Sequence, residues 1–240
     1  MPRPENVGEF RTRDTSTRRL VAAIQRHLAA IYRIDAPIRA EDFLLDAGGR
    51  ARLAERAEVP DAEGQLLVLE EPNALWLGVY LDESVQERLR ARDPYERLDR
   101  GNLPPFLTAV EETSHFLYLL WSVRHGRAVS LLELELQAEV DKFAAGALAI
   151  ASQRKVRAGA LDTESLSRLL FRGWSLDTGL DPDGAIRYRT ASRLAARYCR
   201  SLQRRYLPPH GPFRIDRLLR DLRRFYRQGG DAKIGYISRN

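Results

Sequence analysis

PPFLTAVEETSHFLYLLWSV, residues 104–123, and SLLELELQAEVDKFAAGALAIAS, residues 130–152, are the two stretches that decide the fold. Apolar residues fill most of the first stretch and leave a narrow polar stripe, which is the pattern of a mostly buried helix. Two prolines can open that helix, and Gly126 is suited to end it because glycine accepts the left-handed cap conformation. In the second stretch, Ser130 and Glu133 have the spacing of a capping box. We therefore expect two long helices, over 105–123 and 130–152, joined by a short turn.

The sequence on either side predicts further helices and one β-hairpin. Two segments rich in aliphatic and aromatic residues, 65–71 and 74–82, flank a Pro72-Asn73 turn, as strands of a hairpin do. Helical spacing and capping residues predict helices over 17–33, 50–58, 84–92, 164–173, 190–206 and 214–227, and Asp181-Pro-Asp-Gly184 is typical of a turn. The expected fold class is predominantly helical α+β. Three parts are expected along the chain: a flexible arm over 1–14, a core domain over 15–157 and an arginine-rich helical region over 158–240.

Composition excludes several classes of protein. The chain has 240 residues, 44% hydrophobic and 30% charged, which is typical of a folded protein. It lacks the roughly 18 or more uninterrupted apolar residues of a membrane span, and its first residues are unlike a secretory signal. We therefore expect a cytoplasmic location and no membrane partner. One cysteine, Cys199, excludes internal disulfides and a cysteine-rich zinc module. Glycine-rich phosphate-binding motifs are absent, so no nucleotide cofactor is expected.

The polar stripe of the first long helix carries a candidate site. Glu111 and Glu112 precede His115 by four and three residues, so the three side chains project from one face of the helix. Buried carboxylates are costly unless a metal ion, an arginine or a shared proton compensates them. On the second long helix, Glu135 and Glu139 share a face, and Asp141 and Lys142 follow closely. If the two helices pack as an antiparallel pair, Glu139 approaches Glu112 and His115.

Two segments resemble a known family. FLTAVEETSH (106–115) resembles the HExxH active-site helix of zincins, and EVDKFAA (139–145) resembles the downstream glutamate-containing segment of ImmA/IrrE-type metallopeptidases. The resemblance implies a zincin-like core, with His115 and Glu139 as metal ligands and Glu112 as the general base. Glu111 stands where that family has its first histidine.

The resemblance implies a divergent metal-dependent hydrolase of the metallopeptidase kind, or a regulatory protein that keeps the fold without the chemistry. The cofactor would be one divalent ion, zinc, manganese or iron. A Glu/His/Glu set is harder than His/His/Glu, which favours manganese or iron over zinc. In this interpretation Glu135, Asp141 and Lys142 lie beside the ligands.

Two other interpretations of the acidic stripe stay open. Glu112 and His115 can be a simple pair on a helix surface, with Glu135, Glu139 and Lys142 forming an ordinary ion pair in solvent. A di-metal carboxylate bundle needs two Glu-x-x-His motifs, and this chain has one.

Arginine is concentrated in the C-terminal region. The chain has 36 arginines and three lysines, yet its formal net charge is only +6. Between Arg187 and Arg227 there are 13 arginines and two acidic residues. Eight of the arginines recur at helical spacing and form two expected exposed stripes: Arg193, Arg197, Arg200, Arg204, Arg217, Arg220, Arg224 and Arg227.

These stripes suggest a second function class, a non-enzymatic interaction module. Arginine binds phosphate oxygens through its planar fork, and counterion release adds affinity that depends on salt. The expected partner is therefore a nucleic acid, or else an acidic protein. The remaining interpretation is a solvent-exposed face without a partner, which carries arginine because lysine is rare throughout this chain.

Overall fold

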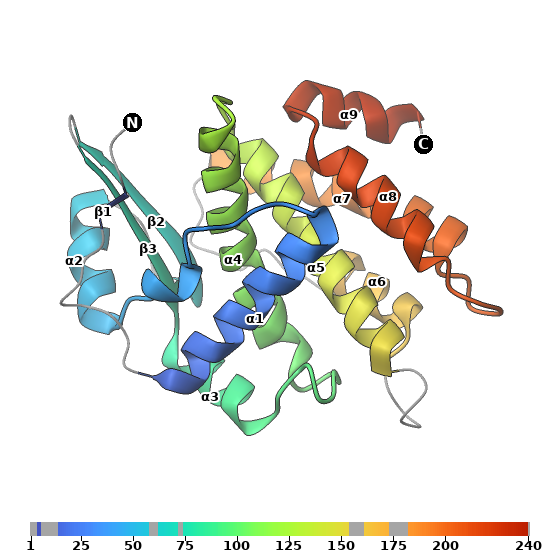
Figure 1. Ribbon diagram of the computed structural model, residues 1–240, viewed down its shortest axis with the longest axis horizontal. Coiled ribbons are helices and arrows are strands. Elements are labelled where there is room, and N and C mark those ends of the chain that lie inside the picture. The colour runs from blue at the N-terminus through green and yellow to red at the C-terminus, as the bar shows by residue number, and fades with distance from the viewer. Residues whose placement is uncertain are drawn as a thin grey trace.

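Helices α4 (Leu103–Arg124) and α5 (Leu131–Gln153) pack side by side through the middle of the molecule, as Figure 1 shows. The computed structural model describes residues 4–5, 14–57, 62–71, 74–153, 161–172 and 182–239. Both helices begin and end within two residues of the bounds expected from sequence. The prediction of a predominantly helical α+β protein with a small hairpin is confirmed.

The other described elements surround this helix pair. They are β1 (Pro4–Glu5), α1 (Thr15–Tyr32), the 3₁₀ helix η1 (Ala40–Asp42), α2 (Ala47–Ala57), β2 (Gly64–Glu71), β3 (Ala74–Leu81), α3 (Glu83–Ala91), α6 (Thr163–Arg172), α7 (Pro182–Tyr206), α8 (Ile215–Tyr226) and α9 (Gly230–Arg239). Among the described residues no helix, α4 and α5 included, has the length and apolar character needed to cross a membrane.

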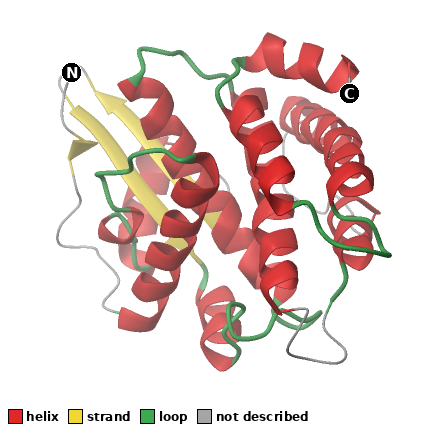
Figure 2. Ribbon diagram, turned by 45° about the vertical axis from the view of Figure 1, so that its right-hand side comes forward, coloured by secondary structure: helices red, strands yellow, loops and turns green. Residues whose placement is uncertain are grey.

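A three-stranded sheet lies at one side of the helical body (Figure 2). β2 and β3 are antiparallel, and the short β1 pairs in parallel with the other edge of β3. Side chains alternate between the two faces of the sheet. Leu77 and Val79 belong to the main core beside α4, whereas Leu67 packs with Leu45 and with Leu53 of α2. Helices therefore cover both faces, and α4 lies directly against the sheet.

α5 is buried along most of its length. It packs against α4, α6 and α7 and also touches α1. Small residues make this possible: a Cβ atom on Gly146 would lie 3.0 Å from the Leu166 side chain of α6. One hydrophobic cluster continues from α1 through α5 to α9. The expected division between 15–157 and 158–240 falls in residues outside the described ones and stays a prediction, although the core runs across it.

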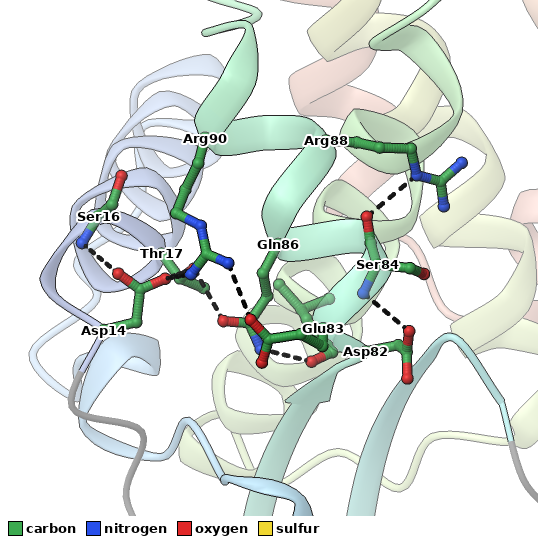
Figure 3. A network of polar contacts seen from close by, with 10 residues as sticks. Asp14, Ser16, Thr17, Asp82, Glu83, Ser84, Gln86, Arg88 and Arg90 are labelled. Carbon is green, nitrogen blue, oxygen red and sulfur yellow. Dashed lines mark hydrogen bonds and ion pairs between the residues drawn. The ribbon is translucent and has the colours of Figure 1, made fainter.

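A polar network fixes α1 against α3, and Figure 3 shows it from close by. Asp14 caps α1 by accepting a hydrogen bond from the Ser16 backbone at 3.0 Å, and it forms an ion pair with Arg90 of α3 at 2.7 Å. Thr17 donates to Gln86 at 3.0 Å in a buried contact. Asp14, the last residue of the expected flexible arm, is thus an ordered helix cap, because it satisfies backbone N–H groups that would otherwise be free.

Four elements differ from the expectations. One of them is the 3₁₀ helix η1, which was not predicted from the sequence. Within the arm expected to lack structure, Pro4–Glu5 forms β1 because it pairs with the edge of β3. The residues 182–184, expected in a turn, form the first turn of α7, since proline is well suited to the first helical position. Helix α9 was not expected from the sequence, and it begins at the second of two consecutive glycines.

Gly78 of β3 permits the close approach of Leu45 to the sheet. A Cβ atom there would overlap the Leu45 Cδ1 atom and would lie 3.0 Å from its Cγ atom. We expect Gly78→Ala to lower the free energy of unfolding by about 1–3 kcal/mol, because the buried neighbour must be displaced. Urea denaturation followed by circular dichroism measures this.

Gly48→Ala is the matched control. Gly48 lies in helix α2, and a Cβ atom there would come no closer than 3.4 Å to a neighbour. Alanine is the better helix former, so this variant should be as stable as the wild type or gain up to about 1 kcal/mol. Equal destabilisation by both substitutions would contradict the packing argument.

Candidate functional site

α4 and α5 bring together three candidate metal ligands, Glu111, His115 and Glu135. One ligand atom from each lies within 4.8 Å of the others. The exposed fractions of these side chains are 20%, 14% and 22%, in that order. Because two carboxylates and an imidazole converge at the edge of the core, the cluster could hold a metal ion that enters from solvent.

His115 lies between two carboxylates. Its Nδ1 atom is 3.6 Å from the Glu112 Oε2 atom, and its Nε2 atom is 3.7 Å from the Glu135 Oε2 atom. Nε2 is buried, and no described residue gives it a hydrogen-bond partner. Gly64 begins β2 directly against Glu112: a Cβ atom there would lie 3.0 Å from the Glu112 Cγ atom. The strand thereby holds Glu112 beside the imidazole.

Carboxylates control the protonation of this cluster. Burial raises the pKa of Glu112 and of Glu135, and His115 partly opposes this rise. Burial lowers the pKa of His115, but Glu112 and then the charges of Glu135 and Glu111 outweigh burial and raise the pKa to about 9. In the metal-free protein His115 is therefore a cation at neutral pH. A proton and a metal ion are alternatives at this ring.

Lys142 separates Glu139 from the cluster. Its ammonium group donates a hydrogen bond to Glu111 Oε2 at 3.0 Å and lies 2.5 Å from Glu139 Oε1. Tyr188 of α7 donates to the same Glu139 oxygen at 3.1 Å. Burial lowers the pKa of Lys142, but Glu111 and Glu139 raise it well above its ordinary value. Glu139 was expected as the third ligand; the carboxylate that joins Glu111 and His115 is instead Glu135, because Glu139 is paired with this buried lysine.

Asp141, expected beside the ligands, takes part in a different buried network. It accepts hydrogen bonds from Ser114 at 2.6 Å, from the Gln137 amide at 2.8 Å and from the Tyr32 hydroxyl. Burial raises its pKa to about 6, although these three hydrogen bonds oppose the rise. The helical turn explains the difference: Asp141 and Lys142 are consecutive, so they project in different directions from α5.

Lys233 of α9 completes this second network, and sequence reasoning did not find it. Its ammonium group donates to Gln137 Oε1 at 2.6 Å and lies 4.1 Å from the centre of the Tyr118 ring. The residue is fully buried. Burial lowers its pKa to about 7, and the carboxylates Glu133 and Asp141 only partly oppose this. One signal was available: a single lysine stands in a region where every other basic side chain is arginine or histidine.

Arginine side chains from α7, α8 and their connection line a groove of about 640 Å³. We call it the arginine groove. Its lining residues are Arg204, Arg205, Tyr206, Pro208, Arg214, Arg217, Arg220, Asp221, Arg224 and Tyr236. Six arginines thus face one aspartate, and the groove is strongly positive.

Eight arginines were expected to form exposed stripes, and all eight are exposed. The structure divides them into two groups. Four of them line the arginine groove: Arg204, Arg217, Arg220 and Arg224. The other four lie outside its lining: Arg193, Arg197, Arg200 and Arg227. Arg197 donates to the Ser238 carbonyl oxygen at 3.1 Å, and Arg227 donates to that of Tyr32 at 3.0 Å. The groove also includes Arg205 and Arg214, which the helical spacing did not predict.

No protein family, curated protein or solved structure matches the chain. The resemblance of α4 and α5 to metallopeptidases of the ImmA/IrrE type therefore stays a prediction. The geometry described above rests on this chain's own residues.

The buried Lys233 makes stability depend on pH. Its pKa is about 7 in the folded protein, against an ordinary value of 10.5. Between these two values the unfolded chain binds more protons, so this residue makes the free energy of unfolding rise with pH. We expect the free energy of unfolding of the wild type, minus that of Lys233→Met, to increase by up to about 1.4 kcal/mol per pH unit from pH 7 to 9.

Urea denaturation of both proteins at several pH values measures this difference. The difference is needed because His115, whose pKa is raised, also makes stability depend on pH, with a sign opposite to that of Lys233. This contribution is the same in both proteins and cancels. A difference that stays constant from pH 7 to 9 would show that Lys233 is charged in the folded state.

Proposed function

We propose that this chain binds one divalent metal ion through Glu111, His115 and Glu135, and that its activity is hydrolysis of the metallopeptidase kind. The observation that carries the proposal is the Nε2 atom of His115, which is buried, has no described hydrogen-bond partner and faces Glu135 at 3.7 Å. A buried polar atom without a partner is costly, and a bound ion would satisfy it.

The donor atoms fit a divalent ion. Glu111 uses one carboxylate oxygen for Lys142, and the other remains available as a ligand. Metal bonds of about 2.1 Å at roughly 90–109° place neighbouring donors about 3.0–3.4 Å apart. The ligand atoms lie within 4.8 Å of one another, so side-chain rotation of roughly 1–2 Å would close the cluster around an ion. Two oxygens and one nitrogen favour manganese or iron over zinc.

Glu112 has a positioning role in this proposal, in place of the general-base role that the family resemblance implies. Histidine ligands of metals commonly donate their second ring N–H to a carboxylate, which fixes the ring. Glu112 lies 3.6 Å from Nδ1, on the side of the ring away from Glu135. It would therefore hold His115 with Nε2 directed to the ion.

Charge balance also favours a cation. Four carboxylates surround the site, namely Glu111, Glu112, Glu135 and Glu139, whereas the described cations in contact with them are Lys142 and protonated His115. A bound divalent ion would replace the histidine proton and supply Lewis-acid activation of a carbonyl group and of water. Lys142 would meanwhile keep its contacts with Glu111 and Glu139.

Variants of the two carboxylate ligands and of Glu112 test the proposal. We expect Glu135→Gln and Glu111→Gln to lower the affinity for Mn²⁺ by at least about 100-fold, because each removes a charged ligand. Glu112→Gln should cost about 10–100-fold, as is typical of residues that orient a ligand. Titration calorimetry of protein purified without chelator measures both, with Zn²⁺ and Fe²⁺ for comparison.

Glu139→Gln distinguishes this ligand set from the one that the resemblance implies. It should leave metal affinity within about threefold of wild type, since Glu139 binds Lys142. A loss as large as that of Glu135→Gln would restore Glu139 as a ligand. Cleavage of an unfolded protein substrate, with and without added metal, tests hydrolysis separately. Metal binding without any cleavage would leave a regulatory protein with a metal site.

A further inference from the structure

We propose that the arginine groove binds a single-stranded nucleic acid, with its phosphate backbone along the arginines of α8 and a base against Tyr206. The site is independent of the proposed metal centre. Three features of the groove support this proposal: its charge, the arrangement of its arginines and the aromatic side chains in its lining.

The aspartate in the groove does not neutralise it. Asp221 is buried and accepts hydrogen bonds from the hydroxyl groups of Tyr198 at 2.8 Å, Tyr206 at 2.9 Å and Tyr236 at 2.8 Å. Its single described ion pair, with Arg205, is 3.7 Å long. The hydrogen bonds of Asp221 are therefore made within the protein, and one aspartate against six arginines leaves the groove with a large excess of positive charge.

Four arginines of the lining are available for a ligand. Within the part of the chain that the structure describes, no ion pair holds Arg204, Arg214, Arg217 or Arg220. Like charges so close together repel one another, so an anion that enters the groove relieves repulsion as well as gaining hydrogen bonds. Arginine is the side chain best suited to phosphate, because its planar fork binds two oxygens at once.

The arrangement along α8 favours a ligand with repeated negative charges. Arg217, Arg220 and Arg224 recur at helical spacing on one face, about 5.4 Å apart per turn along the axis. A phosphate backbone carries regularly spaced charges and can follow such a line. Arg204 and Arg205 of α7 also line the groove.

Aromatic rings in the lining favour a nucleic acid over an acidic peptide. Grooves that bind single strands combine positive charge with side chains on which bases stack. Tyr206 is partly exposed, and Arg205 lies over its ring at 5.4 Å from the centre. Its hydroxyl group is fixed by Asp221, so the ring is held in place before a ligand binds. An acidic peptide has no general need for such a ring.

The charge arm of the test uses fluorescence anisotropy of the full-length chain with labelled 20-nucleotide DNA and RNA strands in 50–300 mM salt. Arg217→Gln with Arg220→Gln should weaken binding at least about tenfold at low salt. The salt slope should fall by roughly 1.4, since each lost phosphate contact removes about 0.7. The control is Arg193→Gln with Arg200→Gln, which removes equal charge from exposed positions of α7 outside the groove and should change affinity less than threefold.

The aromatic arm distinguishes a base from a peptide side chain. Tyr206→Leu should weaken binding of the strands about tenfold, whereas Tyr206→Phe keeps the ring and should stay within threefold of wild type. A poly-glutamate peptide serves as competitor. No binding of either strand, equal losses from the two arginine pairs, or displacement of the strands by poly-glutamate at an equal concentration of charges would overturn the proposal.

Discussion

Burial of charge on one central helix is the constraint on which the rest of the structure depends. Helix α5 carries three ionised or ionisable side chains, Glu139, Asp141 and Lys142, that are at most 2% exposed. Removing such groups from water costs several kcal/mol each unless hydrogen bonds and opposite charges compensate them. Helices α1, α4, α7 and α9 supply part of that compensation, so their positions follow from polar contacts as well as from apolar ones.

The partners come from distant parts of the sequence. Asp141 accepts hydrogen bonds from Tyr32 of α1 and Ser114 of α4. Glu139 accepts one from Tyr188 of α7. Lys233 of α9 donates to Gln137, which in turn donates to Asp141. Such contacts are directional, whereas apolar contacts are not. A helix that slid by one turn along α5 would keep much of its buried area but would leave a charge without a partner. The polar interior therefore specifies how the helices are aligned.

The sequence predicted the parts of the fold that depend on local pattern. The two long helices, the hairpin and the exposed arginine stripes follow from periodicity and turn residues, and the structure places them as expected. Positions that depend on side chains meeting across the core could not be predicted in this way. Glu135 and Glu139 share one face of α5, and only the packing of Lys142 between Glu111 and Glu139 decides which of them lies beside His115. Likewise, Arg205 joins the groove because of where α8 lies, and helical spacing contains no information about that.

The short helix α9 belongs to both the buried polar network and the arginine groove. It places Lys233 in the buried network beside Gln137 and, one turn later, Tyr236 in the lining of the arginine groove. The proton affinity of Lys233 and the shape of the groove therefore depend on the same docked helix. By thermodynamic reciprocity, if a molecule that binds the groove changes the proton affinity of Lys233 by some factor, then protonation of Lys233 changes that molecule's affinity by the same factor.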